Sequence, residues 1–415
     1  MTQLNERILD TPVAKGFRAG THRLIAPSET VERVRRLMPV MGITRIANVT
    51  GLDNIGIPVV MVCRPNARAL SVAQGKGADL AAAKASGLME SVESYHGERI
   101  HLPLKLASYE ELRYTHRVID IDLLARSSDS HFHPHLPVHW IEGFDLMQRE
   151  PVWLPFEVVH TNYTVAMHRS MTGLVATSNG LASGNHLLEA VCHGLCEVVE
   201  RDATTLWRLK SAAMRAEDRI DLASIDDPIC QGLLEKYERA GVAVMVYEIT
   251  SDVGIPAFLC RIFDREDNPL RRLGVMECMG CHPVREVALM RALTEAAQSR
   301  LTMIAGSRDD CYLSTYTQQR NPNIVAPLRA EHARPAAKRF RDGPAWHADT
   351  FNEDVAWELE RLRAAGLKRA VVVNLTKPEF GVPVVRVVVP GLEALSDTRN
   401  YLPGARARAR TGQQA

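Results

Sequence analysis

The apolar positions of the first hundred residues alternate between helical and strand spacing. They recur with a helical period from Pro27 to about Met38 and again from Ala78 to about Arg99. Between these segments, Ile43–Val49 and the more apolar Ile57–Cys63 have the length and composition of strands, separated by a turn at Gly51–Gly56. The order helix, strand pair, helix predicts an α+β fold rather than a doubly wound parallel sheet.

The same order returns later in the chain. A strong helix opens at Ser183-Gly184-Asn185 and runs to about Leu209, and a second long helix is expected over Pro283–Ile304. The least regular stretch is Asn321–Trp346, a candidate loop or lid. No clean domain boundary appears, so we expect a single domain over residues 1–415. The other expected elements are a helix over Trp357–Ala365 that ends at Gly366, and strands at Trp140–Phe144, Pro155–Thr161, Val242–Ile249, Ala257–Asp264, Arg369–Leu375 and Val382–Val389.

Composition and charge exclude several classes of protein. The formal net charge of +1 argues against a dedicated nucleic-acid binder, and we interpret Arg406, Arg408 and Arg410 as a solvated terminus. Residues Met1–Asp10 lack the apolar core of a secretory signal, and no run approaches the roughly 18 apolar residues of a membrane span. The eight cysteines show no disulfide-framework spacing. We therefore expect a cytoplasmic protein that binds neither nucleic acid nor membrane.

Three predicted helices carry carboxylates on one face. At about 100° per residue, the members of the first group share an arc of roughly 60° and those of the second an arc of roughly 80°. The residues between them are mostly Ala, Leu, Met, Val and Cys rather than Lys. The three groups are Ser86-Glu90-Glu93, Glu189-His193-Glu197-Glu200 and Glu295-Gln298-Arg300.

Such faces need positive charge from elsewhere. A solvated helix would place Lys or Arg four residues after each Glu, and only Glu197 has such a partner, Arg201. A single helix of this kind is more simply explained as an exposed amphipathic helix. Three of them favour a site for Mg²⁺, which prefers oxygen ligands and usually binds together with phosphates. Arg201, Arg300 and Gln298 then become candidates for phosphate or amide contacts.

Neither standard phosphate loop is present. Gly75-Lys76-Gly77 lacks the upstream glycine and the following Ser or Thr of a P-loop, and no G-x-G-x-x-G follows a strand. The turn Ser178–Asn185 leads into a helix N-terminus, where backbone N–H groups can bind an anion, although a plain N-cap by Ser183 or Asn185 is the better explanation of this turn taken alone. The segment Lys15–Arg23 is either a basic flap over phosphates or a solvated lead-in.

These motifs together resemble the YcaO family. The resemblance is carried by the three helices, the Ser-Asn-Gly-Leu-Ala-Ser-Gly-Asn turn and the Glu-Arg-Asp ending after residue 199, and it spans Lys15 to about Glu393. The segments KGFRAGTHR, GITRIANVTGLDNIGIPV, GKG and VVPGLE are similar to the members that work with a TfuA partner protein.

The resemblance implies a fold of intertwined, ferredoxin-like helix/strand-pair units around a central nucleotide site. It implies a core over about 15–393, a flexible tail over 394–415, and a homodimer. Its implied activity is ATP- and Mg²⁺-dependent phosphorylation of a peptide amide oxygen, with no protein nucleophile. The implied magnesium ligands are Glu90, Glu93, Glu189, Glu197 and Glu200, and the nucleotide contacts are Lys15, Ser86, Asn185, Arg201 and Arg300, with Gln298 added from its helix.

The product is left open between two chemistries. Azoline-forming members resemble one another in a Pro-x-Pro-x-Pro C-terminus, whereas this chain continues from Tyr401-Leu402-Pro403-Gly404 into Ala and Arg. The TfuA-like segments therefore favour sulfide as nucleophile and a thioamide product, in a natural-product peptide or a cellular protein. Azoline formation on Cys, Ser or Thr is the alternative. A metal-dependent hydrolase and a non-catalytic nucleotide- or peptide-binding scaffold are rivals from other classes.

Two further clusters invite a metal interpretation. Cys278-Met-Gly-Cys281 is a single C-x-x-C without a second pair, so structural thiols are favoured over a zinc site or a sulfur relay at Cys281. His131, His133 and His135 lack carboxylate or Cys neighbours, and we interpret them as part of a loop.

Overall fold

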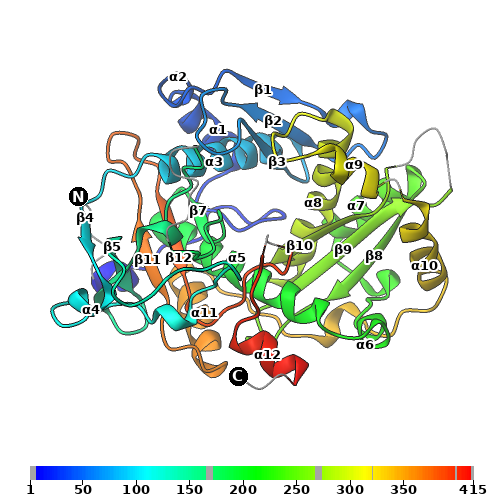
Figure 1. Cartoon of the computed structure of the whole chain (residues 1–415). Coiled ribbons are helices and arrows are strands. Elements are labelled where there is room, and N and C mark those ends of the chain that lie inside the picture. Colours follow the sequence, from blue (N-terminus) through cyan, green and yellow to red (C-terminus); the bar gives the residue numbers. More distant parts are fainter. Residues whose placement is uncertain (1–5, 165–171, 267–272, 320, 398–399, 413–415) are drawn as a thin grey trace.

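The computed structural model describes residues 6–164, 172–266, 273–319, 321–397 and 400–412. Its named strands form three sheets in which all pairings are antiparallel. Helix α5 (Leu187–Arg208) lies in the middle and packs on strands of two of these sheets (Figure 1). Antiparallel sheets combined with long helices confirm the predicted α+β class.

The N-terminal sheet positions the first carboxylate helix, because α3 packs on β2 and β3, and α1 packs on α3. The strand β3 was not predicted, because Val72-Ala-Gln-Gly-Lys has neither alternation nor a continuous apolar run. A Cβ atom at Gly75 of β3 would lie 2.0 Å from the Ala83 carbonyl oxygen, so only glycine allows α3 to lie this close to the strand. The elements are α1 (Pro27–Arg35), α2 (Met38–Met41), β1 (Arg45–Asn48), β2 (Val59–Cys63), β3 (Val72–Lys76) and α3 (Leu80–Glu98).

A second three-stranded sheet repeats this device. A Cβ atom at Gly280 of β10 would lie 2.1 Å from the Ala288 carbonyl oxygen, so α8 also lies against its strand at a glycine. Strand β10 was missed too, because its Cys and Gly content gives little strand signal. The elements are α7 (Pro228–Arg239), β8 (Val242–Glu248), β9 (Ala257–Asp264), β10 (Met276–Cys281) and α8 (Arg285–Ala305).

The third sheet joins the middle of the chain to its C-terminal part. Its strands follow the order β4-β5-β11-β12-β7, with β6 paired to β5, and α5 packs against β12, β7 and α11. The elements are β4 (Leu104–Ala107), β5 (Val138–Asp145), β6 (Glu150–Pro155), β7 (Leu181–Ser183), α11 (Phe351–Ala364), β11 (Val371–Asn374) and β12 (Val384–Val388). Segments far apart in sequence thus lie side by side around α5 (Figure 1).

Two predicted elements are wrong. A strand was expected over Pro155–Thr161, but β6 ends at Pro155 and a 3-10 turn follows at Phe156–Val158. The stretch Asn321–Trp346, expected to be irregular, contains helix α10 (Pro322–His332), whose start is capped by the Asn321 side chain. The remaining short helices are α4 (Tyr109–Leu112), α6 (Ala212–Glu217), α9 (Leu313–Gln319) and α12 (Ala405–Thr411).

The segment expected to be a flexible tail contains α12. Arg406 of this helix donates to both carboxylate oxygens of the buried Asp202, at 2.9 and 3.0 Å, and also pairs with Asp252. These bonds attach the described part of the C-terminus to α5. Among the described residues, no helix is long and apolar enough to cross a membrane.

Candidate functional site

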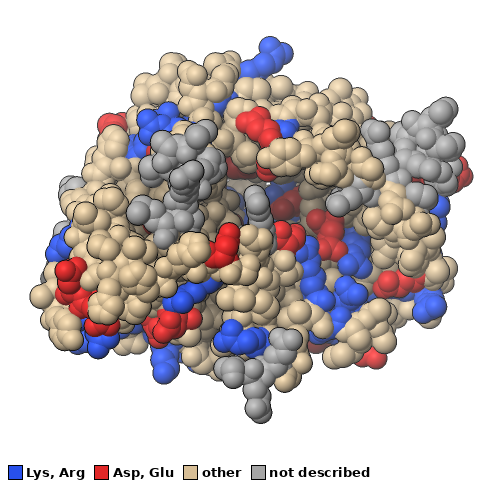
Figure 2. Space-filling view, viewed as in Figure 1, with Lys and Arg blue, Asp and Glu red and all other residues tan. Residues whose placement is uncertain are grey.

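A cavity of about 460 Å³ lies between α3, α5, α8 and the end of β3. In the space-filling view, acidic and basic side chains lie side by side where this face of the molecule is hollowed (Figure 2). All five predicted magnesium ligands and four of the six predicted nucleotide contacts line the cavity. They are Glu90, Glu93, Glu189, Glu197 and Glu200, with Ser86, Asn185, Arg201 and Gln298. Helices α3, α5 and α8, which are far apart in the sequence, therefore converge at one cavity as expected.

The structure does not bring Lys15 or Arg300 to the cavity, which corrects their predicted placement. The Lys15 ammonium is buried and forms an ion pair with Asp354 at 2.6 Å. The Arg300 guanidinium is buried and pairs with Asp53 and Asp264, both at 2.9 Å. A buried cation that already has carboxylate partners inside the protein is not available to phosphate.

On α3, Glu90 and Glu93 face the cavity without a cation in direct contact among the described residues. Burial raises the pKa of Glu90 to about 7, against the opposing charges of Lys76 and Arg308. Burial, together with the neighbouring carboxylates of Glu197 and Glu90, raises the pKa of Glu93 to about 8. The Ser183 backbone N–H and hydroxyl donate to Oε1 of Glu93, at 2.9 and 2.7 Å, and so orient this carboxylate.

On α5, the acidic residues differ in how they are partnered. Burial raises the pKa of Glu200, and its buried Oε2 atom has no hydrogen-bond partner among the residues that the structure describes. The nearest cation to its other oxygen is Arg201, at 3.5 Å. Glu189 is more fully occupied, because it accepts from the Leu24 N–H at 2.9 Å and from Arg23 at 3.3 Å. Glu189 therefore also holds the N-terminal segment against the cavity.

The nucleotide candidates present amide and hydroxyl groups. Asn185 donates to the Thr30 hydroxyl at 3.0 Å, which fixes its amide at the cavity wall. The Gln298 amide nitrogen donates to Oε1 of Gln74 at 3.5 Å, and its own buried Oε1 atom has no partner within the described ranges. Ser86 lies one helical turn before Glu90 on the same wall.

Sequence reasoning missed a set of charged residues at this site. Lys76, at the end of β3, pairs with Glu295 of α8 at 2.6 Å, and both line the cavity. Burial raises the pKa of Glu295, but Lys76 and Arg201 outweigh it and leave the pKa lowered. The other cations that line the cavity are Arg23, Arg291 and Arg308. Lys76 lies in the Gly-Lys-Gly segment, which was compared with a P-loop and with the family but was given no site role. Glu295 was noticed in its helix but not assigned as a site residue.

Comparison with known proteins identifies the family. A family profile described as YcaO cyclodehydratase, ATP- and Mg²⁺-binding, matches residues 74–393. A relative from Rhizobium leguminosarum bv. trifolii, an uncharacterized protein in the tfuA 3′ region, is 40% identical over 89% of this chain and 88% of its own length. An uncharacterized protein of Methanothermobacter thermautotrophicus is 35% identical over 90% of this chain and 95% of its own.

Solved structures share the fold. A heterocyclase in complex with substrate and cofactor matches with a TM-score of 0.79 and 24% identity; the match covers 97% of this chain but only 56% of the heterocyclase. YcaO from Methanopyrus kandleri, bound with AMPPCP and Mg²⁺, matches with a TM-score of 0.72 and 23% identity, over 92% of this chain and 95% of that one. The expected cofactors, ATP and Mg²⁺, are confirmed at the level of the family by the description of its profile. The chain therefore belongs to the YcaO family.

Proposed function

We propose that this protein uses Mg²⁺ and ATP to activate a backbone amide of a peptide or protein, and that sulfide then attacks to give a thioamide. The observation that carries the proposal is the convergence of carboxylates from α3 and α5 in one cavity, where Glu90 and Glu93 contact no cation from the described parts of the chain. Like charges this close repel one another unless an external cation is bound.

The side chains present fit magnesium together with a triphosphate. Glu90, Glu93, Glu197 and Glu200 offer hard oxygen ligands, and the unpartnered Oε2 of Glu200 indicates a missing cation. Arg201 supplies a planar guanidinium of the kind that binds phosphate oxygens in pairs. When bound, magnesium-ATP supplies the phosphoryl group that makes the amide oxygen a leaving group.

The chain's own residues then act by position and charge. Lys76 and Arg201 offset negative charge at the cavity wall, and the pairing of Lys76 with Glu295 keeps its ammonium at the end of β3. The Ser183 donors hold Glu93 in one orientation, which preorganises an oxygen ligand. Because the leaving group is made by phosphorylation, no side-chain nucleophile is needed.

Sulfide is favoured as nucleophile by the TfuA-like sequence segments and by the Rhizobium relative, which is named for its place in a tfuA 3′ region. A TfuA-like protein is accordingly the proposed partner. Azoline formation is the second candidate, because the family profile is described as a cyclodehydratase. The two reactions share the activation step and differ only in what attacks the carbonyl carbon.

Mass spectrometry distinguishes these reactions. Candidate peptides are incubated with the protein, ATP, Mg²⁺, sulfide and a TfuA-like protein. After amide activation by phosphoryl transfer, exchange of oxygen for sulfur adds about 16 mass units to the peptide, whereas ring closure removes about 18. Nucleotide binding with no ADP release and no mass change in any peptide would instead indicate a scaffold. Peptide hydrolysis without nucleotide would indicate a metal-dependent hydrolase.

A further inference from the structure

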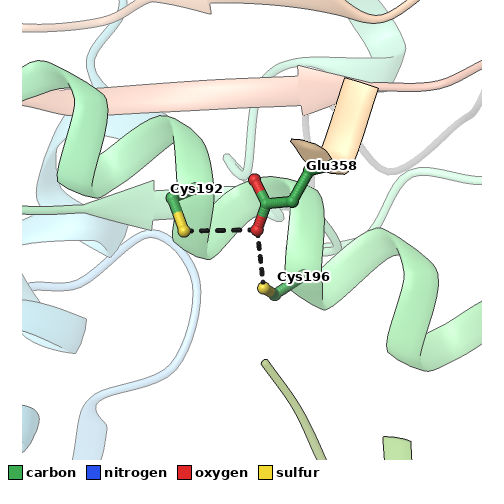
Figure 3. A group of neighbouring side chains, drawn as sticks. All are labelled: Cys192, Cys196 and Glu358. Atoms are coloured by element: carbon green, nitrogen blue, oxygen red, sulfur yellow. Dashed lines mark hydrogen bonds between the residues drawn. The ribbon is translucent and has the colours of Figure 1, made fainter. Parts of the chain in front are cut away.

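A second group of metal-ligand side chains lies outside the cavity, on an adjoining face of α5. Cys192 and Cys196 are one helical turn apart, and both thiols donate to Oε1 of Glu358 on α11, at 3.2 and 3.1 Å (Figure 3). The three ligand atoms all lie within 4.8 Å of one another. On the same helix, the carboxylates that line the cavity project from a face rotated toward α3 and β3.

This Cys–Glu cluster is fully enclosed. The exposed fractions of Cys192, Cys196 and Glu358 are 4%, 1% and 0%. The Cys281 thiol on β10, also buried, hydrogen bonds with Cys196 and so brings a third sulfur to the edge of the cluster. The C-x-x-C pair of the sequence is therefore split: Cys281 belongs here, whereas Cys278 bonds Ser299 at 2.9 Å.

One atom of the cluster lacks a partner. Oε2 of Glu358 is completely buried and, within the described part of the chain, makes no hydrogen bond. Buried carboxyl oxygens are normally paired, so an orphan oxygen on the carboxyl group that both thiols contact needs an explanation. Both thiols donate to Oε1, so neither satisfies Oε2, whereas a cation bound by the carboxylate can contact both of its oxygens.

The geometry suits a tetrahedral cation. Ligand bonds of 2.3 Å to sulfur and 2.0 Å to oxygen place neighbouring ligands about 3.5 Å apart at the tetrahedral angle, close to the observed sulfur–oxygen separations. Two ligands at i and i+4 on one helix face are the spacing used by helical zinc sites. Thiolates select a softer ion than magnesium, which prefers oxygen alone.

We propose that Cys192, Cys196 and Glu358 bind a zinc-type divalent cation that is separate from the magnesium of the cavity, with Cys281 as the neighbouring thiol beside Cys196. The three ligand residues are buried, so the site is closed to solvent and this cation has a structural role. It ties α5 to α11 behind the wall that carries Glu197 and Glu200.

The full chain, purified without a metal-affinity tag, tests the proposal through its metal content. We expect close to one equivalent of zinc per chain, and a fall of about tenfold or more in Cys192→Ala/Cys196→Ala and in Glu358→Gln. Cys278→Ala is the matched control, because Cys278 is an equally buried thiol on the same strand as Cys281 but lies outside the cluster. Its zinc content should equal that of the unaltered protein.

Cobalt provides a readout that needs no variant to fold. The unaltered protein loaded with Co²⁺ should show intense near-ultraviolet absorption from thiolate-to-cobalt charge transfer and the visible bands of a tetrahedral ion. A protein that contains no zinc and takes up cobalt without these bands overturns the proposal. Equal zinc loss in Cys278→Ala and in the cluster variants overturns it as well.

Discussion

Helix α3 carries two kinds of buried carboxylate, and their difference shows how a structural charge is distinguished from a binding one. At the C-terminal end of α3, Glu98 accepts from the two terminal guanidinium nitrogens of Arg64, at 2.5 and 2.7 Å. It also accepts from Arg99 at 2.8 Å and from the Ala69 N–H. Five residues earlier on the same helix, Glu93 accepts, within the described part of the chain, only from the Ser183 N–H and hydroxyl, and its pKa is raised.

The counter-charge of Glu98 is thus built into the fold, whereas that of Glu93 has to come from a ligand. The sequence alone does not separate the two roles, because both residues are Glu on one helix and the main partner of Glu98, Arg64, lies on another segment. Their roles separate only when the cations that face them from other segments are known. Arg64 lies 34 residues before Glu98, on the loop that follows β2.

The largest expected effect is on stability. Glu98→Gln leaves the Arg64 guanidinium buried with an incomplete partner, and we expect it to lower the free energy of unfolding by about 3 kcal/mol. Glu93→Gln, measured in nucleotide- and metal-free protein, should change it by less than about 0.5 kcal/mol, because no ion pair is broken. Chemical denaturation measures both. An equal loss in the two variants would remove the distinction drawn between these carboxylates.

The second-largest expected effect is on nucleotide affinity, where Glu93→Gln should be more harmful than Glu98→Gln. Glu93→Gln and Glu197→Gln should each weaken magnesium-dependent nucleotide binding by about 100-fold or more, because a neutral amide is a poor magnesium ligand. Titration of a fluorescent ATP analogue with and without Mg²⁺ provides the measurement. Glu98→Gln, where folded, should bind as the unaltered protein does. Unchanged affinity in Glu197→Gln would show that Glu197 is not a magnesium ligand.

Helical periodicity predicted which carboxylates share a helix face, whereas the strand patterns missed two strands of the sheets. The positions of Glu90, Glu93, Glu197 and Glu200 follow from a 100° rotation per residue, so their shared faces were predictable before any packing was known. Strands β3 and β10 were not, because each contains a glycine that serves close approach to a helix rather than strand propensity. That requirement exists only in the tertiary structure.

The arginines show most clearly that a local sequence pattern does not predict which distant residues a side chain will contact. Arg201 and Arg300 each follow a carboxylate helix motif and were assigned the same role. Asp53 and Asp264, which hold Arg300, lie on a turn before β2 and at the end of β9, and nothing in the sequence near Arg300 indicates them. Lys76 was missed for the converse reason, since its partner Glu295 is 219 residues away.

The two arginines can be separated by a conservative change. Arg201→Lys keeps the charge but loses the planar fork, and we expect about a tenfold loss of nucleotide affinity with little change in stability. Arg300→Lys should leave nucleotide affinity unchanged and lower stability, because one ammonium cannot satisfy both Asp53 and Asp264. Nucleotide titration and denaturation on the same two proteins measure the contrast. A loss of affinity in Arg300→Lys alone would restore the original assignment.

The smallest expected effect is a proton count. In the metal-free protein the pKa values of Glu90 and Glu93 are raised to about 7 and 8, so at neutral pH protons compete with magnesium for these oxygens. Magnesium-nucleotide binding should release protons at pH 7, and its affinity should rise with pH and level off above pH 8, since both carboxylates are then already ionised. The phosphates, with a second pKa of about 6, contribute little over this range.

Calorimetry of magnesium-nucleotide binding in buffers of different ionisation enthalpy counts the protons released. Glu98→Gln is the control: its carboxylate stays paired with arginine throughout, so its replacement should leave the number of released protons unchanged. Proton uptake at pH 7, or an affinity that does not vary between pH 6 and pH 8, would mean that the α3 carboxylates are ionised without magnesium. Their counter-charge would then already lie within the protein, as it does for Glu98, and α3 would carry only one kind of buried carboxylate.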